Sequence, residues 1–502
     1  MDGQGTTGSG PLRHRARAAS GTFALTGRGI TVFRLAQLAI DLAAAVGACC
    51  LAVIMLPGLT VRDLAGHPGW IVYCSAVGLA WLAGLSLLEL YDPRHWRVFA
   101  YSWARCAFAT AVSTVVAFGL LAVVSAPPDE VNLIVLLGGQ LLGFAAAVSR
   151  YTLYLVIPRR LLTRRFVLVG TDPGAAMLAA AIRERREPPT RLIGVVPLDH
   201  ESGEHPGLGP MVPPDKLADT VASEAVTHVV QCFRAPVPET LARALSDCAV
   251  AGSRVQSLED AYASVTEKAA IFNIKDDEWL ADVRWVETNL YATQVKRALD
   301  ILVSLLLLPI ALPLIGILAV LVKCDSVGPA FFRQTRVGLR GRLFTIVKLR
   351  TMKVDETEVV EPGSEAEERR MTAVGRVLRA TLLDELPQVL QVLKGDMSLV
   401  GPRPEQPHLV ERYSIEVPLY DQRHFVRPGM TGWAQVNQTH AESLRDVVSK
   451  VQYDLYYISH LSFRLDALVL MRTLAITLPG RGKPGHGTEA RAKAGNGPAD
   501  TS

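Results

Sequence analysis

Four apolar runs, near residues 33–56, 69–90, 104–126 and 132–157, restrict most strongly how this chain can fold. Each run has about the 20 residues that a helix needs to cross the hydrocarbon of a bilayer. The runs are apolar nearly all round, which fits lipid exposure better than burial inside a soluble protein. The sequence therefore predicts a four-helix transmembrane bundle over residues 31–157.

Arginine is distributed unevenly among the segments that flank these runs. Three segments are rich in it, with Arg13, Arg15, Arg17, Arg28, Arg34, Arg94, Arg97, Arg105, Arg159, Arg160, Arg164 and Arg165. The other two loops hold one arginine, Arg62. Because basic loops stay in the cytoplasm, we expect the N-terminus and everything after residue 158 on the cytoplasmic face of the membrane.

The two ends of the chain and its net charge add two further expectations. Residues 1–30 and 479–502 are rich in small and charged residues, so both are expected to be disordered tails, the first of them cytoplasmic. The formal net charge of +4 is too small to argue for a nucleic-acid partner.

The middle of the chain, residues 158–285, has the rhythm of a β-α-β unit. RFVLVGTDPGAAMLAAAIRERREPPTRLIGVVPL, which starts at Arg165, runs from an apolar strand through a glycine turn and an alanine-rich helix to a second strand. THVVQCF and SRVQSL continue the alternation. Gly170 and Gly174 supply only part of the GxGxxG fingerprint. A structural or regulatory Rossmann-like domain is therefore favoured over a working nucleotide site.

A fifth apolar segment, residues 296–326, is also long enough to cross the bilayer. Basic residues lie on both of its flanks, which places both flanks in the cytoplasm. Pro309 and Pro313 each remove a backbone donor and bend a helix. We expect a re-entrant helix over 296–323 that breaks near Pro313 and returns to the same face. The alternative, a fifth full span with kinks, would export everything that follows.

The stretch TLLDELPQVLQVLKGDMSLVGPRPE, residues 381–405, places adjacent carboxylates before an apolar helical pattern. Proline is tolerated only in a first turn, so Pro387 predicts a helix that starts near Asp384. Adjacent helical side chains point about 100° apart, so Asp384 and Glu385 are expected to have different roles at phosphate. Arg379 and Arg403 could screen the negative charge. The plainer alternative is a simple capping arrangement.

The stretch DELPQVLQVLKGDMSLVGPRP closely resembles the signature of the bacterial sugar transferases, the polyprenyl-phosphate hexose-1-phosphate transferases, also called monotopic phosphoglycosyl transferases. The resemblance extends over about residues 294–478. It includes KRALDI from Lys296, GPAFFRQTRVGLRGRLFTIVKLRTM from Gly328, RHFVRPGMTGWAQVN from Arg423 and YDLYYISHLSFRLD from Tyr453. Several motifs in the right order are far more specific than any one of them.

The resemblance implies a fold class as well as an activity. Four membrane helices and a Rossmann-like domain ahead of this region are similar to the large members that use undecaprenyl phosphate. The expected fold is a membrane α-helical bundle, an α/β Rossmann-like domain, and a monotopic α/β catalytic domain over 290–478 that carries the re-entrant membrane helix. A bilayer is therefore an expected partner, and a homodimer is left open.

The resemblance also implies roles for the two carboxylates. Asp384 would be the nucleophile that attacks the β-phosphate of a UDP-sugar, releasing UMP and leaving a phosphosugar-aspartyl intermediate. Glu385 would help to bind Mg²⁺. Undecaprenyl phosphate would then accept the sugar phosphate and give a polyprenyl-diphospho-sugar, the first membrane step in building an exopolysaccharide, capsule or O-antigen.

Further residues follow from the same resemblance. The side chains expected to line the phosphate region are Lys348, Arg350, Arg379, Arg403 and Arg427. The chain departs from the family pattern at two positions: Leu382 stands where Ser commonly precedes Leu-Asp-Glu, and Leu312 replaces a Ser that often precedes the helix-breaking proline, here Pro313. Loss of these hydroxyls would alter capping at the first site and support for the bend at the second.

Two alternative functions make different demands on the sequence. A membrane-bound nucleotide-sugar dehydratase or epimerase would need a complete glycine fingerprint and a Tyr-x-x-x-Lys pair, and none of the twelve tyrosines has lysine four residues on. A non-enzymatic scaffold for polysaccharide assembly would leave the carboxylates dispensable. The sequence leaves the sugar open among glucose, galactose and an N-acetylated hexosamine.

Overall fold

The structure is a computed structural model of the whole chain, divided into two compact units, Met1–Thr266 and Glu267–Ser502. The residues it describes are 35, 37–44, 78–86, 90–91, 103, 105–111, 113–114, 129–156, 163–185, 189–198, 208–233, 239–271, 289–354, 369–438 and 443–477, with side chains of the 129–156 helix from Leu142 onward. The two predicted tails and large parts of the predicted membrane spans lie outside these residues. Each unit is considered by itself.

The N-terminal part of the first unit is helical wherever it is described. Its longest element is α6 (Asp129–Val156), and shorter helical stretches lie at 37–44, 78–86 and 105–111. The Arg150 guanidinium binds the Asp41 carboxylate through Nη2 and Oδ2 at 2.6 Å, and both side chains are buried. This pair ties together residues of the first and fourth predicted spans. The four-helix bundle as a whole stays a prediction.

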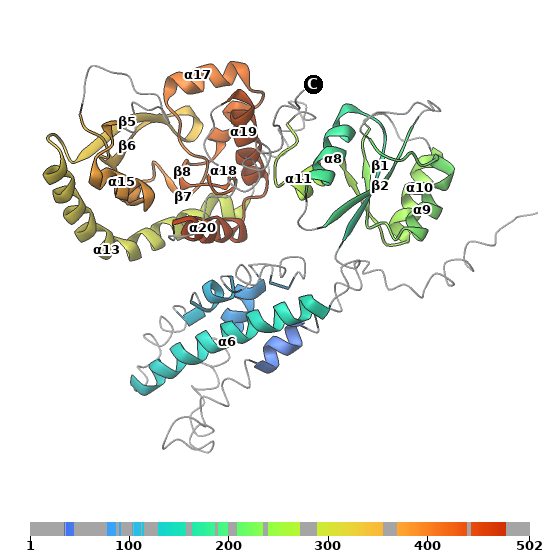
Figure 1. Cartoon of the computed structure of the whole chain (residues 1–502), viewed down its shortest axis with the longest axis horizontal. Coiled ribbons are helices and arrows are strands. Elements are labelled where there is room, and N and C mark those ends of the chain that lie inside the picture. The colour runs from blue at the N-terminus through green and yellow to red at the C-terminus, as the bar shows by residue number, and fades with distance from the viewer. Residues whose placement is uncertain are drawn as a thin grey trace, which may run out of the picture. The chain divides into compact units, whose positions relative to one another are not determined.

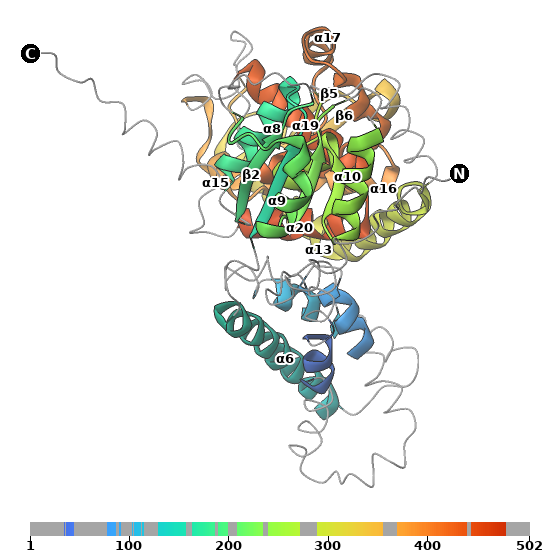
Figure 2. The ribbon, with the colours of Figure 1, turned by 90° about the vertical axis from the view of Figure 1, so that its right-hand side faces the viewer.

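A parallel four-stranded sheet forms the rest of the first unit. Its strands are β1 (Arg164–Val169), β2 (Thr190–Val196), β3 (His228–Gln231) and β4 (Arg254–Ser257), in the order β2-β1-β3-β4. Its helices are α8 (Pro173–Glu184), η2 (Pro214–Lys216), α9 (Leu217–Ser223), α10 (Glu239–Val250) and α11 (Leu258–Thr266). Figure 1 shows α8 and α11 on one face of the sheet and α9 and α10 on the other, and Figure 2 views it from the α9 and α10 side. Strand β1 is central, so its side chains are buried on both faces.

Gly170, one of the two fingerprint glycines, follows β1 at a φ of +108°. A Cβ at this position would lie 2.5 Å from the carbonyl oxygen of Cys232, the residue that follows strand β3. Only glycine fits such a backbone and such a close approach. Chain packing therefore accounts for Gly170 without a bound nucleotide.

The second unit begins earlier than the domain boundary at residue 285 that we expected from the sequence. Ala269 donates its backbone N–H to the Gln452 carbonyl at 2.9 Å. The Trp433 indole donates to the Glu267 carbonyl at 3.1 Å. Residues 267–271 thus belong to the second unit, and residues 272–288 lie outside the described chain.

The second unit mixes helices with two small sheets. Its elements are η3 (Tyr291–Val295), α13 (Lys296–Asp325), β5 (Phe331–Val337), η4 (Leu339–Gly341), β6 (Leu343–Leu349), α15 (Ala373–Ala380), η5 (Leu383–Gln388), α16 (Val389–Lys394), β7 (Ser398–Val400), α17 (Pro407–Glu416), η6 (Tyr420–Phe425), β8 (Gly429–Thr431), α18 (Trp433–Asn437), α19 (Leu444–Ser459) and α20 (Phe463–Thr477). Strands β5 and β6 form an antiparallel hairpin, whereas β7 and β8 pair in parallel. The core gathers around Trp433, Val451, Leu455 and Ile458.

Helix α13 covers the segment that the sequence predicts to be re-entrant, and one expectation about it needs correction. The helix does not break at Pro313 but stays one continuous element of 30 residues with Pro309 and Pro313 inside it. Figure 1 shows it as a long, curved helix along the second unit. Prolines in a helix interior can bend the axis while the turns around them stay helical, because neighbouring turns keep their hydrogen bonds.

Both ends of α13 are bound to the same unit. At its start, Lys296 Nζ lies 2.6 Å from Asp466 Oδ2 in a buried ion pair. At its end, Asp325 Oδ2 accepts the backbone N–H of Val374 at 2.9 Å. Between them the helix exposes many large apolar side chains, namely Leu302, Leu305, Leu306, Leu307, Ile310, Leu312, Ile317, Val320 and Leu321. Tyr291–Asp325 is the one helix of the described residues that is long and apolar enough to cross a membrane.

Candidate active site

The carboxylate dyad lies in a short 3₁₀ helix and not at the start of an α-helix. Leu382 has left-handed backbone angles, φ 57° and ψ 16°, and the helix η5 begins immediately after it. The expected helix therefore starts near the expected place but as η5, which passes into α16 and ends at Gly395 with φ 101°. Pro387 lies within η5, where the missing N–H is less costly than in a long α-helix.

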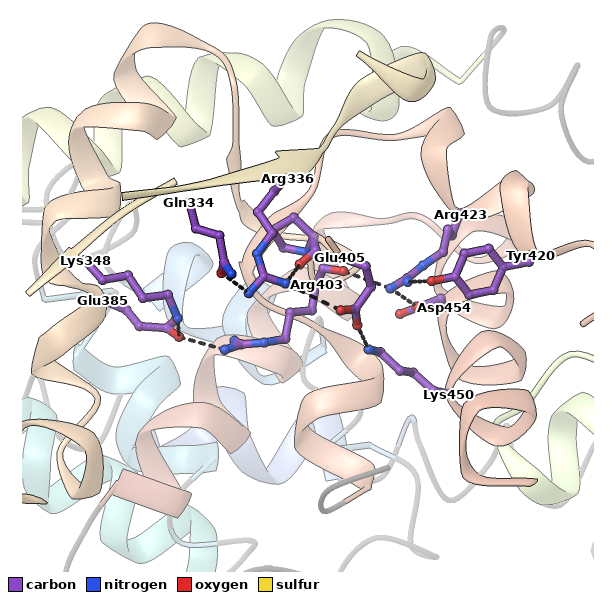
Figure 3. A network of polar contacts seen from close by, with 11 residues as sticks. Gln334, Arg336, Lys348, Glu385, Arg403, Glu405, Tyr420, Arg423, Lys450 and Asp454 are labelled. Atoms are coloured by element: carbon purple, nitrogen blue, oxygen red, sulfur yellow. Dashed lines mark hydrogen bonds and ion pairs between the residues drawn. The ribbon is translucent and has the colours of Figure 1, made fainter. Parts of the chain in front are cut away.

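Glu385 is held by two cations (Figure 3). Its Oε1 lies 2.5 Å from Lys348 Nζ and 3.0 Å from Arg403 Nη2. Lys348 comes from β6 and Arg403 from the loop after β7. Burial alone would raise the pKa of Glu385, but the charges of Arg403 and Lys348 outweigh it and lower that pKa to about 2. Glu385 is thus ionised at any physiological pH.

Asp384 has a different environment from its neighbour. Its side chain is buried, with 8% exposed. It makes no hydrogen bond or ion pair with a described residue. Burial and the adjacent Glu385 charge raise the pKa of Asp384 above its ordinary value, against the pull of Lys348, Arg379 and Arg403. A carboxylate with little solvation and no hydrogen bond keeps its lone pairs available, which suits a nucleophile.

Arg379 completes the cationic surroundings of the dyad. It lies on α15, and its Nε donates to Thr351 Oγ1 at 3.1 Å. Arg379, Lys348 and Arg403 all favour the charged form of Asp384. Three cations thus surround two carboxylates, and this excess of positive charge is what a diphosphate would need at the same place. The structure therefore brings together five of the predicted residues.

The backbone of Arg403 is fixed by a second, fully buried pair. Arg423 Nη2 donates to the Arg403 carbonyl at 2.9 Å and to Asp454 Oδ2 at 2.8 Å. Its Nη1 donates to the Tyr420 hydroxyl at 2.9 Å. The side chains of Arg423 and Asp454 are only 2% and 1% exposed. The loop is thereby anchored to η6 and α19, which leaves the Arg403 side chain to reach Glu385 (Figure 3).

Glu405 anchors the other end of the same loop. Its carboxylate pairs with Lys450, and its Oε2 lies 3.5 Å from Arg336 Nη1. Arg336 Nη1 also donates to the Pro404 carbonyl at 3.2 Å. Burial would raise the pKa of Glu405, but Lys450 and Arg423 lower it to about 2. Glu405 therefore stays charged and paired.

Sequence reasoning missed the supporting residues Arg336, Glu405, Arg423, Lys450 and Asp454. Three of them, Arg336, Arg423 and Asp454, stand within motifs that carry the resemblance, and this was the available signal. Their partners are distant in sequence: Arg423 and Asp454 are 31 residues apart. No local pattern pairs such residues.

Two predicted phosphate ligands bind backbone in this structure. Arg350 donates to the carbonyls of Val327, at 2.9 Å, and Ser326, at 2.7 Å, which fixes the turn after α13. Arg427 Nε donates to the Gly395 carbonyl at 3.1 Å. No contact found among the described residues joins either arginine to the dyad. Their role in phosphate binding stays a prediction.

The residues available for a metal ion are few. No group of three or more His, Cys, Asp or Glu side chains that could hold an ion occurs in the described part of the chain. Both cations on Glu385 contact Oε1, so Oε2 has no hydrogen bond from a described residue. One or two carboxylates together with substrate phosphates are the usual ligands of Mg²⁺. The dyad fits that kind of site and does not fit a metal cage made by protein alone.

Comparison with known proteins places this site within a recognised region. The family model described as bacterial sugar transferase matches residues 291–480. The UDP-N-acetylgalactosamine-undecaprenyl-phosphate N-acetylgalactosaminephosphotransferase of Aeromonas hydrophila is 38% identical over 48% of this chain and 56% of its own length. The UDP-glucose:undecaprenyl-phosphate glucose-1-phosphate transferase of Caulobacter vibrioides is 42% identical over 36% of this chain and 68% of its own.

A third relative extends the similarity toward the N-terminus. The undecaprenyl-phosphate glucose phosphotransferase of Komagataeibacter xylinus is 31% identical over 339 residues, which are 65% of this chain and 61% of that protein. The chain thus spans only part of the length of these relatives.

Proposed function

Because this chain belongs to the bacterial sugar transferase family, we propose that it transfers a sugar 1-phosphate from a UDP-sugar to undecaprenyl phosphate. The products are UMP and a polyprenyl-diphospho-sugar. The observation that carries the proposal is the dyad itself: a buried Asp384 that accepts no hydrogen bond from a described residue lies beside an ionised Glu385, under the charges of three cations.

The proposed reaction has two steps at Asp384. In the first, Asp384 Oδ forms a bond to the sugar-bearing β-phosphorus, the bond from that phosphorus to the bridging oxygen breaks, and UMP leaves. In the second, a phosphate oxygen of the lipid acceptor forms a bond to the same phosphorus. The phosphorus–Asp384 bond breaks, and the carboxylate is restored. Lys348, Arg379 and Arg403 lower the repulsion between carboxylate and diphosphate.

The metal that we propose is Mg²⁺. Glu385 Oε2 accepts no hydrogen bond from a described residue. It would bind the ion together with phosphate oxygens of the UDP-sugar. Such an ion would neutralise charge on the diphosphate. Lys348 and Arg403 keep Glu385 ionised and fix its carboxylate for that purpose.

The proposed architecture has three parts: a transmembrane bundle, a Rossmann-like domain and a monotopic catalytic domain. Both ends of α13 bind the same catalytic unit, which supports an excursion of this helix into one leaflet and a return to the same face. Crossing the bilayer would separate these ends. Together with the arginine distribution, this supports a catalytic unit at the cytoplasmic face of the bacterial inner membrane.

The relatives differ in the sugar of their names, which is N-acetylgalactosamine in one and glucose in the others. Their shared element is undecaprenyl phosphate as acceptor, and this supports a first membrane step in the synthesis of a cell-surface glycan.

The test is release of UMP by the purified full chain with Mg²⁺ and undecaprenyl phosphate, using a panel of UDP-sugars. We expect release with one sugar by wild type and a loss of at least about 10³-fold in Asp384→Asn. Full turnover by Asp384→Asn would refute the proposal and favour the scaffold alternative.

A further inference from the structure

An exposed leucine stands two residues before Asp384, the first carboxylate of the dyad. Leu382 has a left-handed backbone, which disfavours residues with a side chain, and 44% of its surface is exposed. It therefore recovers little of that conformational cost by burial in this chain. An exposed apolar side chain held beside a reacting carboxylate calls for an apolar partner.

A second exposed apolar residue, Val377, lies on the neighbouring helix α15, with 61% of its surface exposed. The opposite side of α15 is anchored: Leu378 is buried in a cluster with Leu318 and Val322 of α13. Leu383, next to Leu382, packs against the same cluster. Val377 and Leu382 are thus held by elements that rest on α13.

Further exposed apolar side chains lie on α13, in the turns around Leu318, which packs in the same cluster as Leu378. Ile317 and Leu321 are exposed, lie one turn apart, and flank the buried Leu318. Helix α13 contacts both α15 and η5. We name Ile317, Leu321, Val377 and Leu382 the acceptor track. It starts on the most apolar helix of the unit and ends one residue before Leu383 and the dyad.

We propose that the acceptor track binds the first isoprene units of the lipid acceptor and so delivers its phosphate to Asp384. This inference rests on the proposed function. The acceptor phosphate must come within bonding distance of the phosphorus on Asp384, so the isoprene units next to it must lie a few atoms away. Val377 and Leu382 are the large exposed apolar residues of α15 and of the turn before η5, and burying them against isoprene is favourable.

The test separates the two steps of the reaction. The variants are Leu382→Ser, Val377→Gln and their combination, made in the full chain and assayed in detergent micelles. Exchange of labelled UMP with the UDP-sugar requires no acceptor and reports the first step. We expect the double variant to raise the KM for the lipid acceptor about tenfold. The fold-change in the rate of UMP exchange should be at least about fivefold smaller than this fold-change in KM.

Two control variants are matched to this design. Leu382→Met keeps an apolar side chain and is expected to raise the acceptor KM less than Leu382→Ser does. Ile415→Gln makes the same kind of change on α17, at a side chain that is 88% exposed, and is expected to leave both readouts unchanged.

The acceptor length distinguishes the track from a general membrane contact. Because the track would hold the first isoprene units, the double variant should raise KM for soluble farnesyl phosphate as well as for undecaprenyl phosphate. An unchanged KM for both, or an effect confined to undecaprenyl phosphate, would overturn the inference. Absence of UMP exchange in the wild type would instead refute the proposed function.

Discussion

The substitution Asp454→Asn tests whether a buried ion pair holds the Arg403 loop. It removes the charge that faces Arg423, while both side chains are almost fully buried, at 1% and 2% exposed. The guanidinium would keep its hydrogen bonds to Tyr420 and to the Arg403 carbonyl, but it would lose its directly paired carboxylate, and Glu405 would be the remaining buried carboxylate that acts on it.

The expected size of the effect follows from these contacts. Removing one partner of a buried pair costs about 3–5 kcal/mol, and the retained amide oxygen of asparagine places this variant near the lower end, at about 3 kcal/mol. For a unit of this size each kcal/mol lowers Tm by roughly 2–4 °C, so we expect a drop of about 6–12 °C. Because the loop carries Arg403, kcat should also fall, by about tenfold.

The assay is thermal unfolding of the purified chain in detergent, followed by UMP release. Glu416→Gln, which breaks the exposed pair between Arg412 and Glu416, is the matched control and should leave Tm unchanged. The double variant Arg423→Met/Asp454→Leu should be closer to wild type in Tm than Asp454→Asn, because no lone charge stays buried. A Tm within 2 °C of wild type for Asp454→Asn would refute this account of the loop.

Three further predictions concern titration and the metal. Burial and Glu385 raise the pKa of Asp384, and activity should fall at acid pH as Asp384 takes up a proton. Lys348→Gln removes a positive charge that stabilises the ionised Asp384, so it should move this fall in a pH–rate profile to higher pH. Burial and the Arg423 charge lower the pKa of His424 to about 4, so the unfolded chain takes up this proton at a higher pH than the folded chain does. The free energy of unfolding should therefore decline by up to about 3 kcal/mol as the pH falls from 6.5 to 4. His424→Gln should flatten that decline in denaturant titrations. Glu385→Gln should raise the Mg²⁺ concentration for half-maximal UMP release by at least about tenfold, and an unchanged Mg²⁺ dependence would remove Glu385 from the metal site.

Local signals account for the end of the catalytic turn better than for its start. Helix α16 ends at Gly395, which follows Lys394 and has the left-handed backbone of a helix terminator, and both features are typical of helix ends. The start lies near the place that Pro387 predicted, but the left-handed angles of Leu382, a residue type that rarely adopts them, could not be predicted from propensity.

Long-range contacts explain the remaining differences. Arg350 and Arg427 carry the same charge as Arg403, yet the structure directs them to backbone carbonyls, and nothing in their neighbouring residues distinguishes these uses. The pairing of Arg336 with Glu405 depends likewise on the folding of β5 against the loop after β7. For Pro313, packing of α13 on the catalytic unit lets the helix continue through a residue that would end an isolated helix.

The most direct measurement of the central claim is the intact mass of the full chain after incubation with its UDP-sugar and Mg²⁺, without lipid acceptor. We predict a stable increase by one sugar phosphate, located on the peptide that contains Asp384, which disappears when undecaprenyl phosphate is added. Asp384→Asn should show no increase. An adduct on another residue, or turnover by the wild type with no adduct at Asp384 under rapid quenching, would contradict the proposed mechanism.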